Sequence, residues 1–307
     1  MLFAGVDAGG TTTRAAVHAA DGTRLGHGTA GPGNPAAHGA TAAAAAIGQA
    51  LRRALDGLDP RLVAASVAGV AGGDDDFAHV LGRVWAECGI PEPPRTAGDV
   101  EVSYAAGTAA PSGTLLLAGT GAAAARFSGR AVTAVADGLG WLLGDEGGGF
   151  WIGRAGVRAA VRALDAGLPY GPLVELVSGH FGVTGEPRRR ADGIVRLAQA
   201  DRMLLAAAAP LVTRAAAAGD GDAADIVAEA ARRLTATAAR LSGEGPIVLA
   251  GGVLAADGPV RTAVLARLAG REVTTARDGT AGACWLAALD RLGDRAAHDR
   301  FTAPHGS

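Results

Sequence analysis

The sequence predicts an α/β protein in which one domain is duplicated, and three observations support that prediction. Three short apolar runs separated by tight turns open the chain, and the same order returns after residue 113. Glycine and threonine stand together at the first turn of each set, in Gly9-Gly10-Thr11 and in Gly119-Thr120-Gly121. Segments with helical spacing of apolar residues follow each set, so helices should cover two separate sheets.

The first half is expected to begin with strands and then alternate between helix and strand. Asp-Gly at residues 21–22, between two apolar runs, is a strong hairpin signal. The predicted strands are Leu2–Val6, Thr12–His18, Arg24–Thr29 and Leu62–Val70, and the predicted helices are Ala37–Leu55, Asp75–Cys88 and Val100–Ala109. Pro111-Ser112-Gly113 has the composition of a linker.

The second half repeats the strands and then inserts a long helical region. The predicted strands are Thr114–Ala118, Ala122–Phe127 and Ala131–Ala136, and helices follow from about residue 149 to about residue 241. A buried strand at Ile247–Ala250 leads into Gly251-Gly252, and a helix is expected from Asp257. A last strand at Glu272–Thr275 precedes a closing helix from Gly279 to about Asp299.

Composition limits the classes of protein. The chain has 307 residues, 49% of them hydrophobic, which suffices for one large or two ordinary domains. A net charge of −2 argues against a nucleic-acid partner. All 28 basic residues are arginine, which excludes a Walker A lysine and a Schiff-base lysine. The N-terminus does not resemble a signal peptide and no apolar run is long enough to cross a membrane, so a cytoplasmic protein is expected.

The two cysteines, Cys88 and Cys284, lie far apart in the chain and form no metal-ligand spacing. Both fall in apolar helical patterns, so buried free thiols are expected.

The first turn, Asp7-Ala8-Gly9-Gly10-Thr11-Thr12-Thr13, combines a carboxylate with glycines and hydroxyls. Glycine allows close approach of the backbone to a ligand, and successive N–H groups form an anion-binding concavity. A neighbouring carboxylate suits Mg²⁺, which takes one or two carboxylates together with water and phosphate oxygens. The segment therefore indicates a phosphate site with Asp7 as metal ligand, although a plain glycine-rich hairpin is the alternative.

Two later glycine turns have competing interpretations. Gly119-Thr120-Gly121 fits the beginning of a dinucleotide-binding fingerprint, but Ser128-Gly129 follows too soon for the helix which that fingerprint requires. A second phosphate turn or a structural hairpin fits better. Gly251-Gly252 leaves room for a nucleotide base or ribose, or permits only a tight turn between strand and helix.

Further polar residues suggest an acceptor site. Asp99 follows a predicted strand and opens a helix, so it could act as a general base or as a helix N-cap. Asn34, between glycine and proline, could contact a sugar or serve turn chemistry. Asp74, in Asp74-Asp75-Asp76, could line a cleft or belong to a charged helix N-terminus. The stretch 137–154 is rich in glycine, acids and tryptophan, as in carbohydrate recognition; glycoside hydrolysis is less consistent with adjacent acids at 145 and 146.

Together these residues resemble the N-acetylglucosamine kinase branch of the actin/hexokinase/heat-shock-chaperone superfamily, also called the BadF/BadG-type ATPases. The first turn is similar to the first phosphate motif of that family, and Gly119-Thr120-Gly121 to its second. Ala250-Gly251-Gly252-Val253 resembles its adenosine motif. The most specific block is Gly144-Asp145-Glu146-Gly147 followed by Phe150-Trp151-Ile152-Gly153.

The resemblance implies a duplicated ribonuclease-H-like (actin-like ATPase) fold with two lobes and a sugar in the cleft between them. The first lobe would comprise 1–111, joined by a C-terminal helix at about 290–300, and the second would comprise 112–289. ATP and Mg²⁺ would be bound, and homodimers are frequent in the family. The implied site residues are Asp99 as base, Asp7 for the metal, Gly9, Gly10, Thr11, Thr12, Thr13, Gly119, Thr120 and Gly121 for phosphate, Gly251 and Gly252 for adenosine, and Asn34, Asp99, Gly121, Gly140, Asp145 and Glu146 for sugar.

Two departures fall on the sugar side. Ala122-Ala123 stands where vertebrate sugar kinases of the family have Ser-Asn, and Leu139 replaces a tryptophan, with Trp141 two residues later. The expected activity is ATP-dependent phosphorylation of the 6-hydroxyl of N-acetylglucosamine or glucosamine. A kinase for another small sugar and a non-catalytic ATP-dependent sensor or activator remain open. Relatives that activate dehydratases through an iron–sulfur cluster fit poorly, because the two cysteines are distant.

Overall fold

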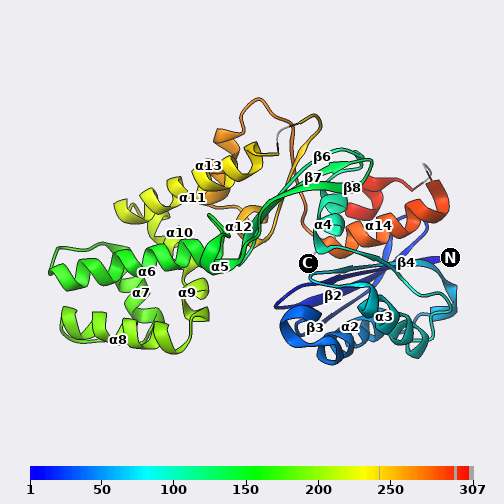
Figure 1. Ribbon diagram of the computed structural model, residues 1–307, viewed down its shortest axis with the longest axis horizontal. Coiled ribbons are helices and arrows are strands. Elements are labelled where there is room, and N and C mark those ends of the chain that lie inside the picture. Colours follow the sequence, from blue (N-terminus) through cyan, green and yellow to red (C-terminus); the bar gives the residue numbers. More distant parts are fainter. Residues whose placement is uncertain (242, 294–295, 304–307) are drawn as a thin grey trace. The chain divides into compact units, whose positions relative to one another are not determined.

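The computed structural model describes residues 1–241, 243–293 and 296–303, and the chain divides into two compact units. The first unit comprises Met1–Pro111, Gly129–Ala131 and the described part of Thr274–Ser307. The second comprises Ser112–Ser128 and Val132–Val273. Each unit contains one five-stranded sheet covered by helices (Figure 1), which confirms the predicted α/β class.

The first sheet has the strand order β3-β2-β1-β4-β5. Its central strand β1 pairs antiparallel with β2 and parallel with β4, and every residue of β1 except Asp7 is buried. A central strand covered on both faces reads as a continuous apolar run, which is how the sequence shows it. The strands are β1 Leu2–Ala8, β2 Thr13–Ala19, β3 Arg24–Ala30, β4 Val63–Val70 and β5 Arg95–Ala97.

The second sheet repeats this order as β10-β9-β6-β7-β8, with β6 in the place of β1. As in the first sheet, the central strand pairs antiparallel with the next strand in sequence and parallel with the fourth. The internal duplication predicted from the two glycine turns is therefore confirmed. The strands are β6 Gly113–Ala118, β7 Ala122–Ser128, β8 Ala131–Asp137, β9 Ile247–Ala250 and β10 Val273–Thr275.

Alternate residues of the first sheet enter two separate cores. On β1, Ala4 and Val6 pack in the core with helices α2 (Ala40–Ala54) and α3 (Asp75–Glu87). Phe3 points to the other core, with helices α4 (Asp99–Gly107) and α14 (Gly279–Leu292). Successive side chains of a strand point to opposite faces, so a single apolar run supplies both layers.

Gly5 allows α14 to pack closely on β1. A Cβ at Gly5 would lie 2.5 Å from the carbonyl oxygen of Thr280 and 2.6 Å from the amide nitrogen of Cys284. The helix backbone therefore touches the strand backbone, and the N-terminus of α14 is held at the carboxyl end of β1.

Two predicted helices are shorter in the structure because glycine interrupts them. The helix expected over Ala37–Leu55 is divided at Gly39, whose φ is +83°, into α1 (Pro35–His38) and α2. The closing helix expected to reach Asp299 ends at Leu292 before Gly293, whose φ is +57°. Residues 294–295, which belong to that range and to the helix expected at 290–300, lie outside the described residues, and a short helix α15 (His298–Thr302) follows. A 3₁₀ turn, η1, covers Pro60–Leu62.

The helical region of the second unit packs on β6 and β9 in one core that includes Leu116 and Leu249. Helix α6 runs through its middle and carries glycines where neighbouring helices touch it. A Cβ at Gly153 would lie 1.9 Å from the carbonyl oxygen of Leu205, and one at Gly156 would lie 2.3 Å from a methyl group of Val212. The helices are α5 Gly140–Leu143, α6 Gly149–Ala166, α7 Pro172–His180, α8 Pro187–Ala200, α9 Met203–Ala207, α10 Ala209–Ala217, α11 Gly221–Ala239, α12 Gly252–Ala255 and α13 Pro259–Arg267.

Two further expectations bear on the class of protein. Among the described helices, none combines the length and apolar character needed to cross a bilayer. Both cysteines are free thiols: Cys284 is buried as predicted, whereas Cys88 is only half-buried. Burial raises the pKa of the Cys284 thiol well above its usual value.

Candidate functional site

The first glycine turn joins β1 to β2, as predicted. Gly9 N–H donates to the carbonyl of Thr12 at 3.1 Å, which closes the turn. A Cβ at Gly10 would meet nothing within 4 Å, so packing inside the protein does not require glycine there. The Oγ1 of Thr13 is buried and has no hydrogen-bond partner in the described part of the chain. The turn thus offers an open backbone to a ligand.

Asp7 lies at the carboxyl end of β1 beside two other carboxylates. Its pKa is raised from 3.8 to about 6, chiefly by burial and also by Asp99 and Asp278, while Arg14 opposes the shift. Helix α14 begins against it: a Cβ at Gly279 would lie 2.5 Å from Asp7 Oδ2. A partly buried carboxylate with acidic neighbours gains from a bound cation.

A cation bound here would need ligands from outside the protein. The described residues contain no group of three or more His, Cys, Asp or Glu placed to hold a metal ion by themselves. Mg²⁺ is commonly held through one or two carboxylates, with water and substrate phosphate oxygens completing the octahedron. The predicted ligand Asp7 is consistent with that mode.

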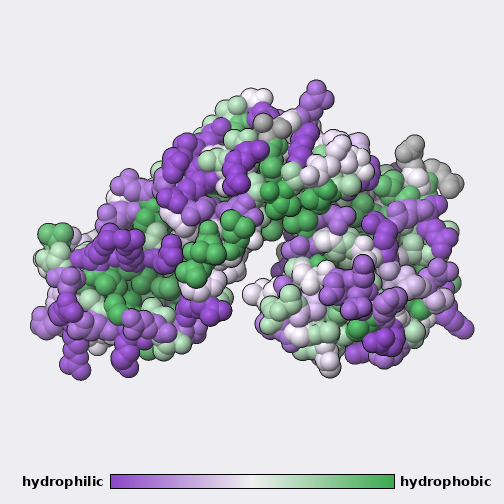
Figure 2. Space-filling model, viewed as in Figure 1, coloured by the Kyte–Doolittle hydropathy of each residue, from purple (hydrophilic) through white to green (hydrophobic). Residues whose placement is uncertain are grey.

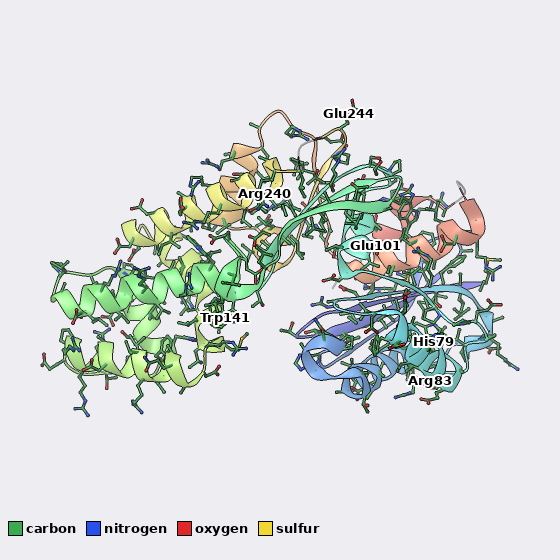
Figure 3. The ribbon with its side chains drawn as sticks, viewed as in Figure 1. His79, Arg83, Glu101, Trp141, Arg240 and Glu244 are labelled. Carbon is green, nitrogen blue, oxygen red and sulfur yellow. The ribbon has the colours of Figure 1, made fainter. Side chains whose placement is uncertain are left out.

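Asp99 is the first residue of α4, but it does not cap the helix. The N-cap is Gly98, whose N–H donates to Glu101 Oε2 at 2.6 Å (Glu101 is labelled in Figure 3). Among the described residues, the carboxylate of Asp99 accepts local backbone hydrogen bonds, with the N–H of Val100 at 3.0 Å. Burial raises the pKa of Asp99, and backbone N–H groups oppose that shift. The N-cap interpretation of Asp99 is therefore wrong, and its carboxylate remains available to accept a proton.

The loop that carries Asn34 is hydrogen-bonded to the first glycine turn. Gly33 N–H donates to the carbonyl of Gly9 at 3.0 Å. Asn34 Oδ1 caps α1 by accepting from Ala37 N–H at 3.1 Å, so its turn role is real. Gly72 lies beside the same amide, since a Cβ there would be 3.0 Å from Asn34 Oδ1. The Nδ2 group is therefore the part of Asn34 that can serve a ligand.

Two neighbours of this loop complete its description. His38 Nε2 hydrogen-bonds to the carbonyl of Gly10 at 3.0 Å, a contact that sequence reasoning missed. Asp74 accepts from Phe77 N–H at 2.8 Å and is the N-cap of α3, so the helix N-terminus interpretation of that residue is confirmed, and Asp74 also lines a cavity. A cavity of about 230 Å³ lies between the beginnings of α3 and α4, lined by Asp74, Gly98 and Glu101 among others.

In the second unit, the turn Gly119-Thr120-Gly121 joins β6 to β7. A strand, Ala122–Ser128, follows it rather than a helix, so the dinucleotide-binding interpretation is excluded. The first residues of α6 are hydrogen-bonded to the turn. Gly149 N–H donates to the carbonyl of Gly119 and Phe150 N–H to that of Thr120, both at 2.8 Å. A Cβ at Gly119 would meet nothing within 4 Å. As at Gly10, the space beside the glycine is open.

Asp145 lies directly on this turn. A Cβ at Gly121 would be 2.6 Å from Asp145 Oδ2. Asp137 holds the segment by accepting the N–H groups of Asp145 and Glu146, each at 2.8 Å. Burial raises the pKa of Asp145, and the nearby Asp137 raises it further. Asp145 also has a positive φ of 55°, which is uncommon for an aspartate and indicates a constrained backbone.

Glu146 has different partners from Asp145. Its carboxylate forms an ion pair with Arg233, which also bonds Glu229 at 2.7 Å. The Arg233 guanidinium stacks on the ring of Trp151 at 4.9 Å. Of the two adjacent acids predicted to contact sugar, only Asp145 lies against Gly121 among the described contacts.

The short helix α5 is strongly exposed and apolar. Gly140 begins it with a φ of +81°, and Leu142 and Leu143 are 67% and 79% exposed. Figure 2 shows hydrophobic side chains gathered over this helix. Trp141, labelled in Figure 3, packs on Phe150 with ring centroids 5.1 Å apart. This apolar surface therefore borders the segment that carries Asp145.

The third glycine site packs on the second turn. Because β9 lies beside β6, with Ala250 opposite Leu117, Gly251 meets the end of β6. A Cβ at Gly251 would lie 2.4 Å from the carbonyl oxygen of Ala118, and its φ is +83°. Gly252 begins α12, and a Cβ there would meet nothing within 4 Å. The structure thus brings two of the predicted nucleotide motifs together in one unit.

A five-stranded mixed sheet repeated in the same order, with a glycine turn after the first strand of each repeat, defines the actin-like ATPase fold. The predicted fold class is confirmed by the solved structures described below. The chain belongs to the BadF/BadG/BcrA/BcrD ATPase family, whose sequence profile matches residues 4–287.

Solved structures with this fold include several proteins of similar length. A candidate N-acetylglucosamine kinase from Chromobacterium violaceum is 25% identical, with a TM-score of 0.72 over 93% of this chain and 98% of its own. A second from Porphyromonas gingivalis is 20% identical, with a TM-score of 0.70 over 95% and 100%. A ROK family glucokinase from Streptomyces griseus, solved with glucose and AMPPNP, is 22% identical, with a TM-score of 0.58 over 94% and 99%. No curated protein matches the chain in sequence.

Proposed function

We propose that the protein is an ATP-dependent amino-sugar kinase that phosphorylates the 6-hydroxyl of N-acetylglucosamine or glucosamine. The contact between Asp145 and Gly121 is the observation that carries the proposal. A half-buried carboxylate suited to sugar hydroxyls lies against a glycine turn suited to phosphate. The proposed sugar contact, Asp145, and the proposed phosphate turn therefore lie next to each other in the second unit. Family membership and the names of the two candidate N-acetylglucosamine kinases support the same assignment.

In the proposed reaction the sugar 6-oxygen forms a bond to the γ-phosphorus of ATP, and the bond from that phosphorus to the bridging oxygen of ADP breaks. Asp99 would take the hydroxyl proton, because its carboxylate makes only local backbone hydrogen bonds within the described residues. The Gly9–Thr13 and Gly119–Gly121 turns would position phosphate oxygens with backbone N–H groups. Phosphoryl transfer depends mainly on such positioning and on neutralising charge.

Asp7 is the residue that would hold Mg²⁺, which neutralises phosphate charge when it is bound. Gly251 and Gly252 would receive adenosine beside the second turn. Asn34 Nδ2, Gly140 and Asp145 would contact the sugar, and Gly140 begins the apolar helix α5, which borders the segment of Asp145. Glu146 would influence sugar binding only indirectly, because its carboxylate forms an ion pair with Arg233.

A panel of acceptors tests the proposal. ADP release is coupled to a spectroscopic readout with glucosamine, N-acetylglucosamine, N-acetylmannosamine, glucose and muropeptide-type sugars. We expect an amino sugar to give the highest kcat/KM. Preference for a neutral hexose would support a kinase for another sugar, and absence of sugar-stimulated turnover would support the sensor or activator. Light scattering of the same samples tests the proposed homodimer.

A further inference from the structure

A second cavity in the second unit lies between helices α6 and α11, apart from the phosphate turn. Its volume is about 480 Å³, within the range of small-molecule sites. One wall carries Arg154, Arg158 and Arg162 from α6, and the other carries Asp222 and Asp225 from α11. None of these residues has a role in the proposed reaction.

The three arginines form a row. They are four residues apart on one helix, so their Cα atoms rise about 6 Å per step along the same face. All three are exposed, and none has an ion pair or hydrogen bond within the described residues. A planar guanidinium is the side chain best suited to hold phosphate by two parallel hydrogen bonds. The row therefore suits an anion such as a phosphate group.

The opposite wall has the complementary chemistry. Asp222 and Asp225 are exposed, lie on the first two turns of α11, and likewise have no partner within the described residues. Charges of opposite sign thus line one cavity without pairing with one another. A ligand that carries phosphate at one end and hydroxyl or ammonium groups at the other would satisfy both walls.

Ion pairs hold one end of the cavity, and this end adjoins the segment that carries Asp145. Arg233 is fixed there by ion pairs with Glu146 and Glu229 and by stacking on Trp151 at 4.9 Å. Glu146, which also lines the cavity, directly follows Asp145. The peptide N–H groups of both acids are held by the same Asp137 carboxylate. A ligand that binds Arg233 would therefore disturb the Glu146 ion pair, one residue away from Asp145, whose carboxylate contacts Gly121.

We propose that this cavity is a regulatory site for a hexosamine phosphate. Its phosphate binds the row Arg154–Arg158–Arg162, and its hydroxyl and ammonium groups bind Asp222 and Asp225. The choice of ligand rests on the proposed function, because the product of an amino-sugar kinase has this chemistry. Occupancy changes turnover through Glu146 and Asp145 rather than by competition with the sugar substrate.

Binding without ATP tests the site directly. Glucosamine 6-phosphate is titrated into the full chain by calorimetry, with inorganic phosphate and glucosamine as separate probes. Product also binds at the catalytic site, so we expect two sites per chain. Arg158→Gln should lose one of them or weaken it at least tenfold, whereas Arg196→Gln, an exposed arginine of α8, should leave both unchanged. Asp225→Asn should weaken glucosamine 6-phosphate more than inorganic phosphate.

A fluorescence arm assigns the location, since Trp151 lines the cavity. Glucosamine 6-phosphate should change the tryptophan emission of the wild-type chain, and Trp151→Phe should remove the component that Arg158→Gln also removes. Equal binding by wild type and Arg158→Gln would overturn the site, and equal affinity for inorganic phosphate would overturn the amino-sugar ligand. A chain that binds here but phosphorylates no sugar would refute only the proposed function. A kinase without Arg158-dependent binding would refute only this site.

Discussion

Asp7 should cost the folded protein stability at neutral pH, and Asp7→Asn should recover it. The pKa of Asp7 rises from 3.8 to about 6 on folding, chiefly through burial. Between these values the native state binds more protons than the unfolded state, so stability falls as pH rises through that window. The shift of about two units corresponds to at most about 3 kcal/mol of destabilisation once Asp7 is fully ionised.

The assay is urea unfolding followed by circular dichroism, in EDTA and without nucleotide. At about pH 7.5 we expect Asp7→Asn to be more stable than wild type by up to about 3 kcal/mol. At about pH 5 the difference should be roughly half of that, because protonation of Asp7 removes the cost of its buried charge in the wild-type protein. Asp56→Asn, an exposed aspartate of the same unit, should not change stability at either pH. Magnesium and ATP together should then stabilise wild type more than Asp7→Asn. An Asp7→Asn protein no more stable than wild type at the higher pH would refute the reasoning.

Three further predictions concern single side chains of the proposed site. Asp99→Asn should lower kcat at least a hundredfold while the Kd for ATP stays within about twofold, because only the base is lost. Burial raises the pKa of Asp99, and the base must be ionised to accept a proton. On acidification, wild-type activity should therefore fall at a pH above the pKa of an ordinary aspartate. Gly119→Ala should fold normally and raise the KM for ATP, because a Cβ there meets no protein atom. Gly251→Ala should lower Tm, because a Cβ at Gly251 would lie 2.4 Å from a backbone oxygen. Equal Tm values for the two variants would contradict the difference between these glycines. Asp137→Asn should lower the free energy of unfolding by about 1–3 kcal/mol, since the N–H of Asp145 or Glu146 would face an amide NH₂. Unchanged thermal unfolding would show that Asp137 does not stabilise the segment of these two acids.

Most of the fold could be predicted because strand signals are local. The β1 and β6 regions read as apolar runs ending in glycine turns, and their repetition implied two similar sheets. The breaks at Gly39 and Gly293 were harder to predict, because an isolated glycine is also tolerated inside a helix. Whether the chain turns there depends on tertiary packing, which no local pattern reports.

The site was predictable where residues are adjacent in sequence and was missed where they are not. Asp278 joins Asp7 and Asp99 only because α14 returns from the end of the chain to β1. Asp137 was inside the stretch singled out for its acids and glycines, but its role as hydrogen-bond acceptor for two later N–H groups follows from a turn that the sequence does not specify. The separate partners of Asp145 and Glu146 likewise depend on Arg233, which lies 87 residues further along.

The glycines of the predicted nucleotide motifs include two kinds that look identical in the sequence. At Gly121 and Gly251, protein atoms lie 2.6 Å and 2.4 Å from where a Cβ would be, so packing explains the glycine. At Gly10, Gly119 and Gly252, nothing lies within 4 Å, and φ is not positive at any of them. Neither packing nor backbone conformation requires glycine at these three positions, which are predicted to face phosphate or adenosine. Close approach of a ligand is a physical reason for glycine at these positions, and it predicts that alanine there changes nucleotide affinity before it changes stability.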